Sequence, residues 1–214
     1  PRIRVAGVAV PGEPLDNPET YETFRLLHRR FPALTLCVST NGLLLPDRVE
    51  ALTDCGVRTL TITINAVHPG PAAALYSSVR WRGTVLPPEE GVPLLLSRQR
   101  EGLERAVQAG FTVKVNTVLV PGVNQDEIPS IAALAGAAGA ALMNITRLIP
   151  CGLLDGRAPP TPAQLHHARR LAGAHLPQFT HCRQCRADAC GVPGLEAKEA
   201  PSGSHPVLNR SRTL

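Results

Sequence analysis

The stretch GFTVKVNTVLVPGVN, residues 110–124, decides the fold class of this chain. Apolar and polar side chains alternate along residues 111–116, and the side chains of an extended strand point alternately to its two faces, so the pattern predicts a strand with one polar face. Helical periodicity precedes this strand over residues 94–109 and follows it over residues 125–138. A strand between two helices is the unit of parallel sheets and barrels.

The same unit recurs along the chain, which predicts an α/β fold. The expected strands cover residues 2–10, 34–40, 59–65, 111–119 and 140–148. The expected helices cover residues 18–30, 46–55, 94–109, 125–138 and 162–175. Asn17 before Pro18 suits a helix start, and Gly56, Gly110 and Gly139 stand where helices should end.

The predicted strands are apolar on one face only. In residues 59–65, Leu60 and Ile62 share one face, and Thr61 and Thr63 share the other. A parallel strand covered on both sides should be apolar throughout, so the polar faces should line a wide or incomplete barrel that holds a polar ligand. An antiparallel sheet with one solvated face has the same alternation and remains an alternative.

Lys114 is the most informative residue of these polar faces. A buried ammonium group without a partner would lose its proton or destabilise the fold. We therefore expect Lys114 to face an anion or the polar edge of a bound ligand. A lysine that reaches solvent at a strand edge is the alternative.

Two segments interrupt the alternation of strands and helices. Residues 67–93 are too long for a simple strand-to-helix loop and are rich in proline, so we expect an irregular excursion that could act as a lid. Residues 195–214 mix Ser, Pro, Lys and Arg without periodicity, which predicts a disordered tail.

The composition predicts a globular chain and excludes several classes of protein. With 43% apolar residues the chain can bury a core, and no stretch reaches the roughly 20 apolar residues of a membrane span. The net charge is +5, but aromatic residues make up only 3% of the chain, and no basic patch is interleaved with them. We therefore expect a cytoplasmic location, without a nucleic-acid or membrane partner.

Cys182 and Cys185 form a Cys-x-x-Cys pair, a spacing at which two thiolates can turn toward one metal centre. The spacing alone leaves zinc, iron–sulfur and thiol–disulfide roles open. A redox role is disfavoured because the pair does not open a helix after a first strand, and a zinc ribbon would need a second pair. The neighbouring His181 could ligate the metal or cap the loop.

The other cysteines indicate a role in metal binding less clearly. Cys37 lies on a polar strand face, where its thiolate could reach a cluster, although a lone strand cysteine is most often a small buried apolar residue. Cys55, at a predicted helix end, is expected to be such a residue. Cys151 and Cys190 lie in predicted loops, and their roles are open.

Three predicted strands end in loops that could hold a small polar ligand. They are residues 10–14 (VPGEP), 39–42 (STNG) and 120–124 (VPGVN). Ligand sites of barrels gather at the C-terminal ends of the strands, so these loops together predict a binding site there.

Five motifs stand in order along the chain: PGEPL at residues 11–15, CVSTNGL at 37–43, TITINA at 61–66, KVNTVLVPGVN at 114–124 and HCRQCRAD at 181–188. Together they resemble the NifB family of radical SAM enzymes, which builds the carbide-centred iron–sulfur precursor of the nitrogenase cofactor. The resemblance implies an incomplete barrel of the TIM type over residues 1–176, with S-adenosylmethionine (SAM) held against a 4Fe-4S cluster. A cysteine-containing extension with cluster ligands then covers residues 177–194, before the tail at 195–214.

The resemblance also implies roles for individual residues. The loop that meets the methionine amino group of SAM consists of Pro11, Gly12 and Glu13. Contacts near the cofactor come from Ser39, Thr40 and Asn41. The pocket lining consists of Thr63, Asn65, Lys114, Asn116 and Asn144.

Three cysteines are implied in the reaction itself. Cys37 is similar in position to a cysteine that serves the substrate clusters, and Cys182 with Cys185 resembles the ligand pair for one of these clusters. The family reaction is of the lyase or methyl-transfer type. A methyl group is transferred to the clusters, a deoxyadenosyl radical abstracts hydrogen, and two 4Fe-4S clusters fuse around the carbon. Iron–sulfur cluster donors and carrier or assembly proteins of the nitrogenase cofactor are the implied partners.

The sequence departs substantially from the family pattern, above all in the ligands of the radical cluster. The Cys-x-x-x-Cys-x-x-Cys motif that binds the radical cluster does not occur in residues 1–214, and the chain opens on Pro1 instead of methionine. We therefore expect a truncated barrel without its first strand, inactive on its own. An iron–sulfur carrier or scaffold without radical chemistry is the alternative function, and a molybdopterin maturase is disfavoured by the motif at residues 181–188.

Overall fold

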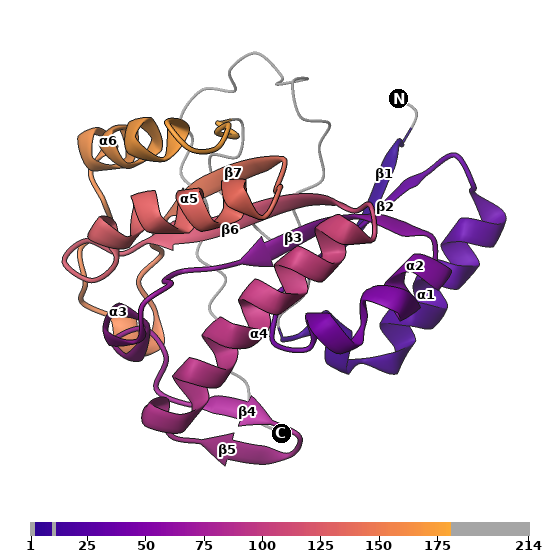
Figure 1. The fold of residues 1–214 in the computed structure, drawn as a ribbon, viewed down its shortest axis with the longest axis horizontal. Helices are drawn as coiled ribbons and strands as arrows, with labels where there is room; N and C mark the ends of the chain where they lie inside the picture. The colour runs from indigo at the N-terminus through magenta and orange to yellow at the C-terminus, as the bar shows by residue number, and fades with distance from the viewer. Residues whose placement is uncertain (1–2, 10–11, 181–214) are drawn as a thin grey trace, which may run out of the picture.

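A parallel sheet forms the centre of the molecule. Figure 1 shows a computed structural model of the chain, which describes residues 3–9 and 12–180. The sheet has five strands in the order β1-β2-β3-β6-β7, and each pairs in parallel with its neighbours. The strands are β1 (Val5–Val8), β2 (Thr35–Thr40), β3 (Val57–Thr63), β6 (Thr112–Leu119) and β7 (Leu142–Arg147).

The sheet confirms the five predicted strands. Each observed strand lies within its predicted range, except β3, which is displaced toward the N-terminus by two residues. The antiparallel alternative is wrong, because helical crossovers between the strands make every neighbouring pair of this sheet parallel.

The predicted helices are also present. The longer helices are α1 (Pro18–Arg30), α2 (Val49–Asp54), α4 (Pro88–Gln108), α5 (Ile128–Ala137) and α6 (Pro162–Gly173). Short 3₁₀ turns are η1 (Pro14–Asp16), η2 (Leu45–Asp47), η3 (Gln125–Glu127) and η4 (Gly152–Leu154). α1 begins where predicted because the Asn17 side chain accepts a hydrogen bond from the Glu19 amide and Pro18 fills the first helical position.

The prediction of an irregular excursion over residues 67–93 is wrong. This segment contains the short helix α3 (Pro69–Ala73), the antiparallel hairpin of β4 (Val79–Trp81) and β5 (Thr84–Leu86), and the first six residues of α4. Both turn residues of the hairpin, Arg82 and Gly83, have positive φ, which matches the twist of a two-residue hairpin. Pro93 lies inside α4, where it removes one backbone hydrogen bond near the N-terminus without ending the helix.

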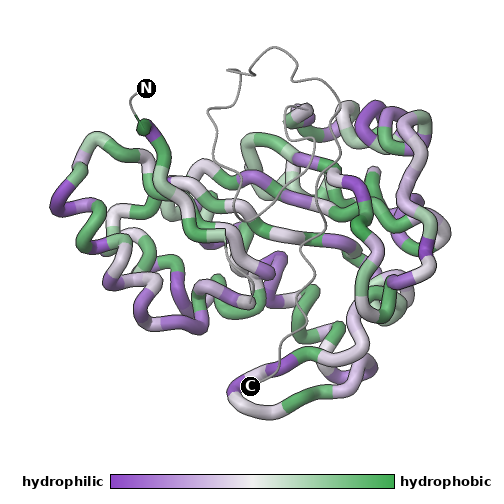
Figure 2. The backbone as a smooth tube through the Cα atoms, turned by 180° about the vertical axis from the view of Figure 1, so that it is seen from behind, coloured by the Kyte–Doolittle hydropathy of each residue, from purple (hydrophilic) through white to green (hydrophobic). Residues whose placement is uncertain are grey.

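The helices bury the apolar face of the sheet. The main core joins Phe24 of α1, Leu52 of α2, Leu103 of α4 and Ile131 of α5 to the apolar side chains of the strands. In Figure 1, α4 and α5 cross in front of the strands, and Figure 2 shows the strands from the opposite side. The predicted alternation of the strand faces is therefore confirmed.

Residues 177–179 lie along the free edge of β7. The Met143 amide donates to the Pro177 carbonyl oxygen at 2.8 Å, and the Phe179 amide donates to the Met143 carbonyl oxygen at 2.7 Å. Gln178 pairs in parallel with Met143. The beginning of the segment predicted for residues 177–194 thus extends the sheet, and the rest of that segment and the tail lie outside the described residues.

No helix in the described part of the chain is long and apolar enough to cross a membrane.

Candidate functional site

The loops after β1 and β2 are held together by one carboxylate. Glu13 Oε1 accepts hydrogen bonds from Thr40 Oγ1 at 2.6 Å and from the Leu15 amide at 3.1 Å, and Glu13 Oε2 accepts one from the Asn41 amide at 2.8 Å. Gly12 turns the chain into this contact with a φ of 101°. The structure therefore brings together Glu13, Thr40 and Asn41, three residues predicted for one site.

The Thr40 and Asn41 side chains also shape the turn that follows. Thr40 Oγ1 accepts from the Gly42 amide at 3.0 Å, and Asn41 Oδ1 accepts from the Leu43 amide at 2.8 Å. Ser39 lies one residue earlier on β2, half-buried on the polar face of the sheet. Pro11, predicted for the same loop as Glu13, lies outside the described residues.

Cys37 and Lys114 lie near one another on the polar face. Burial raises the pKa of the Cys37 thiol, while the Lys114 ammonium and a hydrogen bond with the Thr61 side chain act in the opposite direction. Lys114 Nζ lies 5.5 Å from the centre of the Phe179 ring, a cation–π distance. Lys114 is half-buried on the inner strand β6, so it is not a lysine of a sheet-edge strand.

Asn65, just after β3, is held from two sides. Its Oδ1 accepts from the Val118 amide at 2.9 Å, and its Nδ2 donates to the Tyr76 hydroxyl at 3.2 Å. Thr63, two residues earlier, is half-buried and shares its polar face. These bonds tie the end of β3 to β6 and to the segment after α3.

Asn116 and Asn144 face each other across β6 and β7. Asn144 Nδ2 donates to Asn116 Oδ1 at 2.8 Å, as their pairing in register allows. Asn144 is buried, and its Oδ1 has no hydrogen-bond partner among the residues that the structure describes. A buried acceptor without a partner destabilises the fold unless a ligand or water supplies a donor, so this pair suits a binding site.

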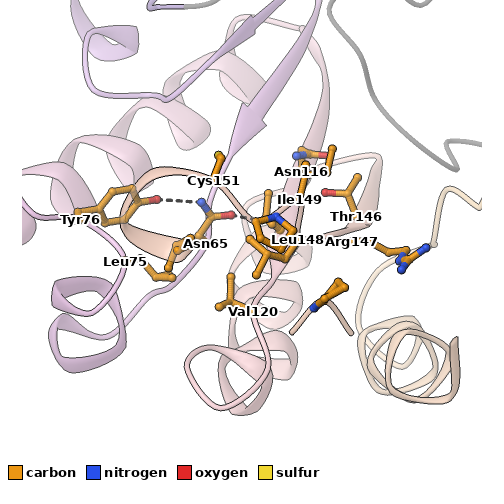
Figure 3. A pocket seen from close by; sticks show the side chains of 14 residues that line it. Asn65, Leu75, Tyr76, Asn116, Val120, Thr146, Arg147, Leu148, Ile149 and Cys151 are labelled. Atoms are coloured by element: carbon orange, nitrogen blue, oxygen red, sulfur yellow. Dashed lines mark hydrogen bonds between the residues drawn. The ribbon is translucent and has the colours of Figure 1, made fainter. Parts of the chain in front are cut away.

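A cavity of about 650 Å³ opens at the C-terminal ends of β3, β6 and β7. Figure 3 shows the labelled residues Asn65, Asn116 and Thr146 around it, with Tyr76 bonded to Asn65. Most other side chains of the lining are apolar, among them Val120 and Leu148. A mostly apolar cavity with a few polar groups is typical of a site for a small organic ligand.

The structure does not bring all predicted residues into this cavity. Among the predicted residues, Asn65 and Asn116 line it. Glu13, Thr40 and Asn41 form a separate hydrogen-bonded group at the ends of β1 and β2.

Two residues of the site region were missed by the sequence prediction. Tyr76 lies within the supposed irregular excursion, and burial raises the pKa of its phenol while the hydrogen bond with Asn65 lowers it. Gln99 of α4 is buried and donates through Nε2 to the carbonyl oxygens of Asn41 at 2.8 Å and Thr63 at 3.0 Å. Gln99 stands four residues after Leu95 and four before Leu103, so helical periodicity places it on the apolar face of the helix. The sequence alone could therefore have predicted that this glutamine is buried.

Within residues 3–9 and 12–180, no three His, Cys, Asp or Glu side chains lie close enough to hold a metal ion. The three described cysteines are free, and Cys55 is buried as expected, whereas Cys151 is exposed. Cys182 and Cys185, with His181 and Cys190, lie outside the described residues. The described part therefore does not itself supply the ligands of an iron–sulfur cluster.

The comparisons with known proteins define the class of protein. Residues 8–135 match the family model of the radical SAM superfamily, so the chain belongs to this superfamily. Solved structures agree on the fold. SuiB of Streptococcus suis bound to S-adenosylmethionine superposes with a TM-score of 0.56 at 12% identity, over 82% of this chain and 39% of SuiB. A radical SAM methyltransferase from Sphaerobacter thermophilus gives a TM-score of 0.54 at 21% identity, over 78% of this chain and 48% of the methyltransferase.

Within that class, three curated relatives carry the name FeMo cofactor biosynthesis protein NifB. The protein from Klebsiella pneumoniae is 39% identical over 100% of this chain and 49% of its own length. The protein from Methanocaldococcus infernus is 38% identical over 90% of this chain and 63% of its own length. The protein from Azotobacter vinelandii is 39% identical over 91% of this chain and 40% of its own length. The chain thus spans about half the length of the curated relatives that it matches.

Membership of the superfamily implies SAM and a 4Fe-4S cluster as cofactors, and the described residues fit the first of these. The cavity has room for the adenosyl part of SAM, with the amides of Asn65 and Asn116 as polar groups and apolar side chains for the base. The cluster has no ligand set among the described residues.

Proposed function

We propose that this chain is part of a radical SAM enzyme of nitrogenase cofactor biosynthesis that binds the adenosyl group of SAM in the cavity at the ends of β3, β6 and β7. The cavity supports the proposal, because Asn65 and Asn116, two residues that the family resemblance implies as pocket lining, both line this space for a small organic ligand. The similarity to the NifB proteins over most of this chain supports the reaction class.

In the complete enzyme, the proposed reaction fuses two 4Fe-4S clusters around a carbon atom derived from SAM. Cys37 and the pair Cys182 and Cys185 are the proposed thiolate ligands of the substrate clusters. Iron–sulfur cluster donors supply those clusters, and carrier or assembly proteins of the nitrogenase cofactor accept the product.

Residues 1–214 alone are proposed to be inactive in SAM cleavage. The sequence contains no Cys-x-x-x-Cys-x-x-Cys motif, and a 4Fe-4S cluster that leaves one iron free for SAM needs three protein thiolates. The same observation favours a second candidate, an iron–sulfur carrier that does not use SAM. The two candidates differ in whether the cavity binds an adenosyl ligand.

Replacing Asn116 by alanine is expected to weaken the binding of S-adenosylhomocysteine, a stable analogue of SAM, about fivefold. The change removes an amide that lines the cavity and the acceptor for Asn144 Nδ2, and one hydrogen bond contributes roughly 1 kcal/mol. Isothermal titration calorimetry measures the dissociation constant. Thr112→Ala is the matched control, because Thr112 begins the same strand and is exposed.

Two outcomes count against the proposal. If the unaltered chain binds no S-adenosylhomocysteine, the cavity is not a SAM site and the carrier function is favoured. Equal dissociation constants of S-adenosylhomocysteine for Asn116→Ala and Thr112→Ala would show that Asn116 does not contribute to ligand binding.

A further inference from the structure

The loop after β6 is joined to the end of β3 by the buried side chain of Asn124. Its Nδ2 donates to the carbonyl oxygens of Asn65 and Val118, both at 2.8 Å, and its Oδ1 accepts from the Val120 amide at 2.8 Å. Asn124 is fully buried, so these three bonds are not exchanged for bonds to water. The backbone positions of Asn65 and Val120, both of which line the cavity, are thereby fixed relative to each other.

Glu127, three residues further along, binds the segment that follows Asn65. Its Oε2 accepts from the amides of Val67 at 2.8 Å and His68 at 2.9 Å, and its Oε1 lies 2.8 Å from His68 Nδ1. Burial alone would raise the pKa of this carboxyl group, but the hydrogen bonds from Val67 and His68 outweigh it and lower the pKa. Glu127 is therefore a charged carboxylate that holds three donors from one short segment.

The segment held by Glu127 leads directly into one wall of the cavity. His68 precedes α3, and the chain after α3 contributes Leu75 and Tyr76 to the lining. α3 has five residues and buries only Ala72 among its own side chains, too little for a short helix to hold its position alone. The hydrogen bond between Tyr76 and Asn65 closes the loop that starts at Asn65.

We propose that Glu127 and Asn124 are positioning residues for the ligand of the cavity. Glu127 fixes the wall that carries Tyr76, Asn124 fixes the end of β3 against the loop after β6, and together they set the width of the space that receives the adenosyl group. Neither side chain lines the cavity itself. The inference rests on the proposed function of the cavity and assigns these two residues to it.

The experiment compares Glu127→Gln with the control Glu104→Gln in the 214-residue chain. Glu104 is a more exposed glutamate of α4 paired with Arg100, so both variants lose one charge. Only Glu127→Gln replaces one of the two carboxylate oxygens that accept from Val67 and His68 by an NH2 group, which cannot accept a hydrogen bond. S-adenosylhomocysteine is the probe. The chain has two tyrosines, Tyr21 and Tyr76, so ¹³C labelling of tyrosine gives one signal from the cavity wall and one reference from α1.

For Glu127→Gln we expect the dissociation constant of S-adenosylhomocysteine to rise about tenfold, the effect of losing one charged hydrogen bond. The Tyr76 ring signal should shift without ligand, the Tyr21 signal should stay in place, and amide hydrogen exchange should accelerate at Val67 and His68. A purely structural role would not shift Tyr76 selectively. Glu104→Gln should leave all three measurements unchanged.

The outcomes separate the inference from the proposed function. If the unaltered chain does not bind the probe, the proposed function fails and the inference falls with it. If the unaltered chain binds the probe and Glu127→Gln binds it equally, with Tyr76 unshifted, only the inference is overturned.

If Glu127→Gln unfolds the chain, both tyrosine signals will move. In that case the milder variant His68→Ala tests the positioning role of Glu127. This change removes the ring contact to Glu127 Oε1 and keeps both backbone donors, and the His68 side chain is 63% exposed, so the fold should tolerate it. A selective shift of Tyr76 with about twofold weaker binding supports the inference. An unshifted Tyr76 with unchanged affinity overturns it.

Discussion

Replacing both Cys182 and Cys185 by alanine is expected to remove most of the iron that this chain binds after anaerobic reconstitution with iron and sulfide. A Cys-x-x-Cys pair can bring two thiolates to one cluster, and thiolates are the usual protein ligands of 4Fe-4S clusters. The described part of the chain holds no group of three potential metal ligands that could replace the pair. Iron per chain and the visible charge-transfer absorption of the cluster measure the effect.

The matched control changes Cys151 and Cys190 to alanine, which also removes two thiols. Cys151 is an exposed free thiol of the cavity lining, and Cys190 lies five residues after Cys185. This control should keep most of the iron. Equal iron content and equal spectra in the two double variants would refute the assignment of Cys182 and Cys185 as ligands.

Replacing Phe24 by alanine is expected to lower the free energy of unfolding by about 3–5 kcal/mol, as for other buried aromatic residues. Phe24 of α1 is completely buried and belongs to the core between the helices and the sheet. Its loss would leave a cavity that the rigid strands cannot fill. Urea denaturation followed by far-ultraviolet circular dichroism measures the change.

Phe31 provides the control for this prediction. It follows α1 directly, is 51% exposed and should lose little stability on replacement by alanine. Similar unfolding midpoints for Phe24→Ala and Phe31→Ala would show that α1 is not packed as described.

The strands could be predicted from the sequence because the alternation of apolar and polar residues along each strand reflects which side chains are buried. In β6, Val113 and Val115 are buried, whereas Lys114 and Asn116, which alternate with them, are only half-buried, as the period of two requires. The segment at residues 67–93 could not be predicted in the same way. Its prolines suggested an irregular loop, but Pro69 and Pro88 occupy helix starts, where a missing amide donor is tolerated.

The candidate site could be predicted only in part for a related reason. Asn65 and Asn116 follow the strand pattern and their motif, so the sequence identified them. Glu127 and His68 are 59 residues apart, and the contact between them has no local signal. Their pairing depends on β3 and β6 being neighbours, which only the three-dimensional fold establishes.

The contact between residues 177–179 and β7 has a consequence for solubility during folding. A free sheet edge offers unpaired amides and carbonyls to a strand of another molecule, which promotes aggregation. At the β7 edge, both backbone groups of Met143 are already bonded to Pro177 and Phe179, and the Ile145 carbonyl accepts from Arg169 Nη2 at 2.9 Å. Deleting residues 177–179 would expose this edge and is expected to promote self-association of the chain through its β-sheet, which size-exclusion chromatography measures.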